Sequence, residues 1–169
     1  MGIADELLKT LSDEESEDIW EAAKALADMR THEVTPGLIR VLQEGTPDQQ
    51  SAAAYVMGWQ EDPASIGPLR AVAVDKDVDP DVRGHAIEAL GMMEVTDALQ
   101  DLIALLADDS PEVRYWSCFA LGCLGDPSSI PALERLAAEE DVMLKHPRSL
   151  RQEALDTLDI LRGVPERDA

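Results

Sequence analysis

The sequence has few aromatic residues and no long apolar run. Aromatic side chains make up 4% of the 169 residues: three Trp, two Tyr and one Phe. A core must therefore be built from Ala, Leu, Val, Ile and Met, which suits packed helices. No stretch of about 18 apolar residues could span a bilayer. The opening MGIADELLKTLSDEESED is acidic, unlike a secretory leader, so we expect a cytoplasmic chain.

Basic residues are scarce. The chain has 14 Lys and Arg residues against 35 Asp and Glu residues, for a net charge of -21. Phosphate backbones and anionic lipid headgroups would repel such a surface, so we expect neither nucleic acid nor a membrane as a partner. Two interpretations of the acidity stay open: a protein partner with a basic surface, or adaptation to a salt-rich cytoplasm. A DNA mimic that occupies a DNA-binding protein is a third alternative.

Residue patterns typical of catalysis or metal binding are missing. Cys118 and Cys123 stand five apart, which on a helix separates them by about 140° around the axis and argues against a disulfide or a metal pair. The histidines, His32, His85 and His146, lie in different parts of the chain and outside any nucleophile motif. We therefore predict no catalytic residue, no cofactor and no metal site.

What the sequence does contain is an internal repeat with a period of just over thirty residues. Three segments align: TPDQQSAAAYVMGWQEDPASIGPLRAV, DPDVRGHAIEALGMMEVTDALQDLIALL and SPEVRYWSCFALGCLGDPSSIPALERLA. Each has a proline at the start of a first helix, a glycine near its end and an aliphatic residue opening a second helix. These are Pro47, Pro80 and Pro111; Gly58, Gly91 and Gly122; and Ile66, Leu99 and Ile130. Each unit is predicted to be a helix hairpin.

The repeat extends in both directions. Residues 16–45 fit an earlier unit, and LRQEALDTLDILRG supplies only the first helix of a later one, after a loop predicted around VMLKHPRS. Hydroxyl or carboxylate caps precede the three prolines, as helix starts require. Ser12 and Glu15 have the spacing of a capping box for the helix that holds Trp20.

The N-terminal residues predict a separate capping segment. A short helix there would have one apolar side, able to cover the first hairpin as solenoid ends require. That side consists of Ile3, Leu7, Leu8 and Leu11. We predict a capping segment over residues 1–15, a repeat domain of four helix pairs and a closing half over 16–163, and a polar tail over 164–169.

The pattern P-x-V-R-x-x-A-x-x-A-L-G, followed by a second helix, resembles HEAT repeats. The resemblance is closest to the short bacterial kind also found in phycobilisome lyases, and it is strongest over residues 79–106 and 110–136. It implies an all-α fold, a right-handed α-α superhelix. The first helices would then lie on its convex face and the second helices would line its concave face.

The resemblance also implies a ladder of charged pairs between units. An acidic residue in the turn before a first helix would pair with the arginine of that helix or of its neighbour. The candidates are Asp77, Arg83, Asp108 and Arg114. We predict a structural role for these pairs, since the planar guanidinium of arginine suits bidentate contacts.

All six aromatic residues occur on predicted first helices, mostly away from the expected core face. We call five of them the aromatic stripe: Tyr55, Trp59, Tyr115, Trp116 and Phe119. Exposed aromatic side chains bury a large area at a low entropic cost, so the stripe is a candidate site for a protein partner. Two alternatives stay open: the rings pack between adjacent first helices or under an end cap, or they hold a pigment or another flat ligand.

The second helices suggest another candidate surface. Arg40, Arg70 and Arg135 stand at predicted outward positions of the second helices, near small residues such as Ala71 and Ala104. Such a groove could admit a peptide or helix and hold its carboxylates. The alternative is a mixed, solvated surface.

Together these patterns favour a scaffold or adaptor that binds another protein and has no catalytic activity of its own. The resemblance implies one alternative function, a subunit of a bilin lyase or a related chromophore-handling factor. An oligomer that uses the aromatic stripe as its interface is a further alternative.

Overall fold

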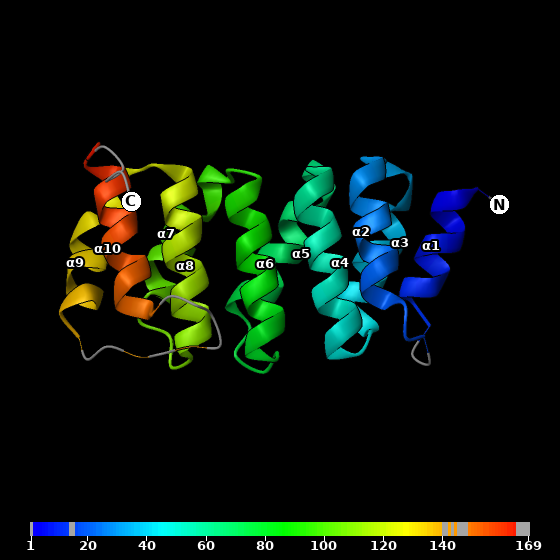
Figure 1. The fold of residues 1–169 in the computed structure, drawn as a ribbon, viewed down its shortest axis with the longest axis horizontal. Helices are drawn as coiled ribbons and strands as arrows, with labels where there is room; N and C mark the ends of the chain where they lie inside the picture. Colours follow the sequence, from blue (N-terminus) through cyan, green and yellow to red (C-terminus); the bar gives the residue numbers. More distant parts are fainter. Residues whose placement is uncertain (1, 14–15, 140–141, 143, 145–148, 165–169) are drawn as a thin grey trace.

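The computed structural model describes residues 2–13, 16–139, 142, 144 and 149–164. The predicted loop around residues 142–149 and the predicted tail over 164–169 lie largely outside these residues. Within them the chain is all-α, and Figure 1 shows its helices packed in neighbouring pairs along one axis. The protein is therefore an α-solenoid, as predicted.

The helices alternate between two rows. The first helices are α2 (Ile19–Met29), α4 (Pro47–Gln60), α6 (Pro80–Met92), α8 (Pro111–Leu124) and α10 (Leu150–Leu161). The second helices are α3 (Thr35–Glu44), α5 (Ile66–Val74), α7 (Leu99–Leu105) and α9 (Ile130–Ala138). In Figure 1 the first helices stand side by side in chain order, and α3, α5 and α7 lie behind them.

The helix starts follow from local capping. The side chains of Thr46 and Ser110 accept hydrogen bonds from the third residue of α4 and of α8, and Asp79 accepts one from the second residue of α6. These starts confirm the prediction. A single 3-10 turn precedes each second helix, and the predicted starts of α5, α7 and α9 are also confirmed. The turns are His32–Val34, Pro63–Ser65, Thr96–Ala98 and Pro127–Ser129.

The predicted capping box before α2 is wrong. Ser12 is the C-cap of α1 (Ile3–Leu11), where its hydroxyl donates a hydrogen bond to the Leu8 carbonyl at 2.7 Å. The N-cap of α2 is Asp18, without a side-chain capping bond. The short side chain of Ser12 therefore completes the preceding helix.

Helix α1 packs on the first hairpin, as the predicted capping segment should. Leu11 is fully buried, and Leu8 lies so close to Gly37 of α3 that a Cβ there would come within 2.3 Å of Leu8 Cδ2. Ile3 does not share this apolar side, because it is 71% exposed and Ala4 is buried in its place.

The core lies between the two rows and consists mainly of Ala, Leu, Val, Ile and Met, as the composition predicts. Small residues bring the first helices close together. A Cβ on Gly58 would come within 3.0 Å of the Cα of Ala89, and one on Gly91 within 2.7 Å of the Cα of Ala120. Because glycine and alanine at these contacts take up little space, a large side chain of one first helix can extend over the neighbouring first helix.

Candidate functional site

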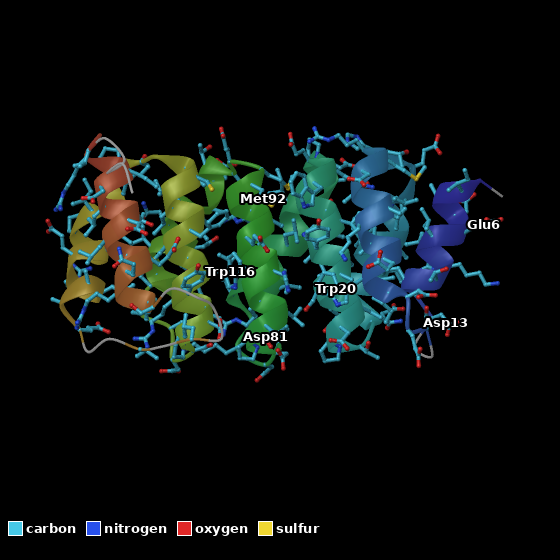
Figure 2. The ribbon with its side chains drawn as sticks, viewed as in Figure 1. Glu6, Asp13, Trp20, Asp81, Met92 and Trp116 are labelled. Atoms are coloured by element: carbon cyan, nitrogen blue, oxygen red, sulfur yellow. The ribbon has the colours of Figure 1, made fainter. Side chains whose placement is uncertain are left out.

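A row of aromatic rings crosses the first helices. The Trp20 ring of α2 lies 5.5 Å from the His85 ring of α6, and the His85 ring stacks 6.4 Å from the Trp116 ring of α8, measured between centroids. In Figure 2, Trp20 and Trp116 lie on either side of α6, and Asp81 lies at one end of that helix. The row therefore runs across four consecutive first helices, α2 to α8.

These rings line a groove of about 260 Å³, which we call the aromatic groove. Its residues are Trp20, Asp48, Ser51, Asp81, His85, Glu112 and Trp116. They come from four successive hairpins, and the first and last of them, Trp20 and Trp116, stand far apart in the sequence. The solenoid stacking alone brings them together.

Small residues make room for the row. Ser51 of α4 lines the groove where the row crosses that helix. On α6, a Cβ at Gly84 would come within 2.6 Å of Trp116 Cδ1. Glycine at this position therefore lets the indole of α8 lie directly against α6.

Three carboxylates stand along the aromatic groove. Asp48, Asp81 and Glu112 line it from α4, α6 and α8, and each directly follows the proline that opens its helix. Carboxylates are favourable in the first turn because they complement the positive end of the helix dipole. Glu88 of α6 is not a groove residue, but its Oε2 lies 3.3 Å from Nδ1 of the groove residue His85. The groove thus combines ring surfaces with negative charge.

The whole aromatic stripe belongs to one continuous set of ring contacts. Its further contacts, centroid to centroid, are Trp20–Tyr55 at 5.9 Å, Tyr55–Trp59 at 6.2 Å, Tyr115–Trp116 at 5.3 Å and Trp116–Phe119 at 5.7 Å. Tyr55, Tyr115 and Trp116 also pack against the core. These three rings therefore pack partly inside the protein, and each also leaves part of its surface open to solvent. Trp59 is 39% exposed and lies outside the groove.

The three arginines of the second helices have different surroundings. Arg70 of α5 donates two hydrogen bonds to Asp101 of α7, from Nε at 3.1 Å and Nη2 at 2.7 Å. Arg40 is exposed and lines a pocket of about 320 Å³ between α1, α3 and the start of α4. Arg135 is exposed on α9. Arg70 thus stabilises the contact between successive second helices.

Arg83 and Asp108 form the buried pair that the ladder predicts. The Arg83 Nη2 to Asp108 Oδ2 distance is 2.7 Å, and the side chains are 4% and 3% exposed. Arg83 Nε also donates to the Ala73 carbonyl at 3.1 Å. Burial by itself raises the pKa of Asp108, but hydrogen bonds from Arg83 and from the Ser110 N–H, with the charge of Arg83, lower it overall. The pair joins α6 to the turn before α8.

The other two residues predicted for the ladder, Arg114 and Asp77, differ in whether they form an ion pair. Arg114 pairs with Glu139, Nη1 to Oε2 at 3.2 Å, which is the same sequence separation of 25 as in the Arg83–Asp108 pair. Asp77 is exposed, and no ion pair joins it to another residue in the described part of the chain. The prediction for Asp77 is therefore wrong, because the pairing runs from each arginine to the next unit.

The two cysteines are not activated nucleophiles. Burial raises the pKa of the Cys118 thiol, and the nearby Glu153 raises it further. Burial and then Glu94 raise the pKa of Cys123. Both side chains therefore stay protonated at neutral pH. Among the described residues there is no cluster of three or more His, Cys, Asp or Glu residues that could hold a metal ion.

The predicted aromatic stripe leaves out Trp20, His85 and the three carboxylates. The repeat register contains a signal for each of them. His85 shares its position with Trp116, Trp20 shares its position with Tyr115, and each carboxylate follows an opening proline. The register gives these equivalences within units, but not the contact of Trp20 with a helix two units away.

The fold and the groove define a class of protein, an α-solenoid of helix hairpins with an aromatic groove across its first helices. The family model for HEAT repeats matches residues 4–79 and 72–159. The chain therefore belongs to the HEAT-repeat family. A search of curated proteins found no match. In the described part of the chain, no helix is long and apolar enough to cross a membrane.

Proposed function

We propose that this HEAT-repeat protein is a non-catalytic adaptor that binds another protein through its aromatic groove. The observation that carries the proposal is the row of Trp20, His85 and Trp116 across four first helices. Trp20 is 36% exposed although its ring contacts two other rings, those of Tyr55 and His85. Tryptophans in partly formed pockets are typical anchors of protein interfaces.

The charge of the groove favours a partner with a basic surface. Asp48, Asp81 and Glu112 line it, and the whole chain carries a net charge of -21. Complementary charge raises the rate of association and selects against acidic competitors. The second helices are less suited to a carboxylate-bearing partner, because Arg70 already pairs with Asp101.

The test uses two tryptophans with nearly the same exposure. Trp20 lines the groove and is 36% exposed, whereas Trp59 lies outside it and is 39% exposed. Wild-type protein, Trp20→Ala and Trp59→Ala would each be immobilised and incubated with native lysate, after circular dichroism shows that all three are folded. Retained proteins would be identified and quantified by mass spectrometry.

We expect a specific protein to be retained by the wild type and by Trp59→Ala but lost with Trp20→Ala. Truncation of an anchor residue costs about 2 kcal/mol or more, which is roughly a thirtyfold loss of affinity. Equal retention by all three variants would contradict a role for the groove.

The resemblance to phycobilisome lyases supports a second reading, in which the rings contact a tetrapyrrole. Co-expression with a source of bilin distinguishes the two. A chromophore-handling protein would purify with visible absorbance that Trp20→Ala reduces, whereas an adaptor would purify colourless.

A further inference from the structure

A second pocket lies at the end of the solenoid that α1 covers (Figure 1), apart from the aromatic groove. Its volume is about 320 Å³, and it is bounded by α1, α3 and the start of α4. This volume is at the lower end of the range for small-molecule sites, about 300–1,000 Å³. Leu8 of α1 and Val41 of α3 give it apolar walls. The pocket therefore has the size and the lining of a site for a small molecule.

Two opposite charges line this pocket without a partner. Arg40 and Glu44 stand four residues apart on α3, and both are exposed. In the part of the chain that the structure describes, no ion pair or side-chain hydrogen bond joins either of them to another residue. Residues four apart on a helix are close enough to pair with each other, yet these two do not. Both charges are therefore available to a ligand.

The third polar group is the amide of Gln49, which lines the pocket from the first turn of α4 and is 2% exposed. Its Oε1 accepts a hydrogen bond from the Thr46 N–H at 2.9 Å. Because a backbone N–H can only donate, this bond fixes the orientation of the amide. The Nε2 of Gln49 is then a buried donor with no hydrogen-bond partner among the described residues. Such groups are rare in proteins, and an oxygen atom of a ligand would supply the missing acceptor.

The charges around the pocket favour a zwitterion over a simple anion. An anion would be attracted by Arg40, but Glu44 and the net charge of -21 would repel it. A zwitterion has no net charge, so its carboxylate can bind the guanidinium and the Gln49 amide while its ammonium binds Glu44. The apolar walls would then cover an aliphatic group.

We infer that this pocket binds a free α-amino acid with an aliphatic side chain. The carboxylate of the ligand lies between Arg40 and the Nε2 of Gln49, and its ammonium faces Glu44. Its side chain lies against Leu8 and Val41. The pocket is separate from the aromatic groove, so this inference does not depend on the proposed function.

The probe is leucine, compared with two compounds that each lack one of its charged groups. Isocaproate lacks the ammonium and isoamylamine lacks the carboxylate, while the aliphatic part is the same. Titrations would follow the amide NMR signals of isotope-labelled protein, and the side-chain NH₂ signals of Gln49 would be assigned by their loss in Gln49→Glu. That variant keeps an acceptor for the Thr46 N–H.

We expect leucine to shift the Gln49 side-chain signals and the N–H signals of Gly37 and Gly45, which also line the pocket. It should bind about two- to fivefold more tightly than either compound, because each lacks one partly exposed ion pair. Two outcomes would overturn the inference. One is the absence of a saturable shift up to about 10 mM leucine, tenfold above a dissociation constant of about 1 mM. The other is equal affinity for all three compounds.

Matched variants test the roles of the two charges. Arg40→Gln removes the cation of the pocket, and Arg135→Gln removes an exposed arginine of α9 outside it. We expect Arg40→Gln to weaken leucine binding about two- to fivefold and Arg135→Gln to leave it unchanged. Glu44→Gln should weaken binding of leucine but strengthen binding of isocaproate, because it removes a repulsion. Equal effects of the two arginine variants, or weaker binding of isocaproate to Glu44→Gln, would contradict the assignment. Circular dichroism and urea unfolding control for folding.

Discussion

Two neighbouring junctions of the solenoid, α4 with α6 and α6 with α8, share one kind of contact and differ in another. Both rely on a glycine that lets two first helices touch. A Cβ would lie 3.0 Å from the opposing Cα at Gly58 and 2.7 Å at Gly91. The shape of the contact is thus nearly the same in the two junctions.

The polar contacts of the two junctions are different. Arg83 reaches across the second junction to the buried Asp108. At the first junction Gln50 holds the place of the arginine, and Asp75 stands as far after Gln50 as Asp108 does after Arg83. Gln50 donates to the Leu42 carbonyl at 2.9 Å, as Arg83 does to Ala73, but Asp75 is exposed. Close packing of the first helices is therefore enough to stack two units. An ion pair between units adds to the stability of the fold only where it is buried, as at Arg83 and Asp108.

The largest expected effect comes from Arg83→Met, which breaks the second junction. It leaves the carboxylate of Asp108 buried without its cation, and such a change costs about 3–5 kcal/mol. Urea unfolding followed by circular dichroism measures the loss. The control is Arg70→Met, which breaks a pair that is 38% and 37% exposed and should cost at most about 1 kcal/mol. Equal losses would show that burial does not decide the contribution.

A methyl group on Gly91 tests the contact that the junctions share. Gly91→Ala places a Cβ within 2.7 Å of the Ala120 Cα, and overpacking of this kind costs about 1–3 kcal/mol. Gly58→Ala should cost less, since its clearance is larger. Gly67→Ala in α5 meets nothing within 4 Å and should stabilise the protein by up to about 1 kcal/mol. Thermal unfolding compares the three, and equal midpoints would contradict the close-packing account.

Acid should weaken the second junction. The folded-state pKa of Asp108 lies below its ordinary value of 3.8, so the stabilisation is present above about pH 4 and is lost as the pH falls through the lower, folded-state pKa. The difference in unfolding free energy between the wild type and Arg83→Met should therefore shrink between pH 6 and pH 3, by about 1.4 kcal/mol per unit of pKa difference. Urea unfolding across this range measures it. A constant difference would contradict the assignment to Asp108.

The smallest expected effect is a gain at the first junction. Gln50→Arg supplies the guanidinium that the second junction has, at the same sequence separation from Asp75 as Arg83 has from Asp108. Because Asp75 is exposed, the new pair should add at most about 1 kcal/mol. A double-mutant cycle with Asp75→Asn isolates the pair, and a coupling energy of zero would mean that the arginine does not reach the next unit.

Much of the fold could be predicted because its causes are local. The starts of α4, α6 and α8 depend on a capping side chain and a proline within a few residues, and the repeat makes each start visible three times. The start of α2 was harder to predict, because Ser12 has a capping pattern that serves the end of α1 instead. A short polar side chain can complete a helix on either side, and only packing decides which.

The candidate site was predictable in part. The repeat register places Trp116 and the other stripe residues on first helices, away from the expected core face. In the structure Tyr55, Tyr115 and Trp116 are half-buried against the core, and Trp59 is exposed. The register does not place Trp20 near His85, because that contact spans α4 and depends on small groups such as Ser51. The residue pattern of α2 alone cannot show that the Trp20 ring extends across α4 to contact α6.

The sequence by itself determined the helices, their pairing and the acidic, aromatic character of the first-helix row, because periodicity and capping act within a few turns of the chain. The tertiary structure alone decided that Trp20, His85 and Trp116 form one groove, that Asp108 is buried against Arg83 and that Asp77 is not. These contacts depend on the distance between stacked units. That distance is set by how closely opposing backbones approach, as at Gly91 and Ala120.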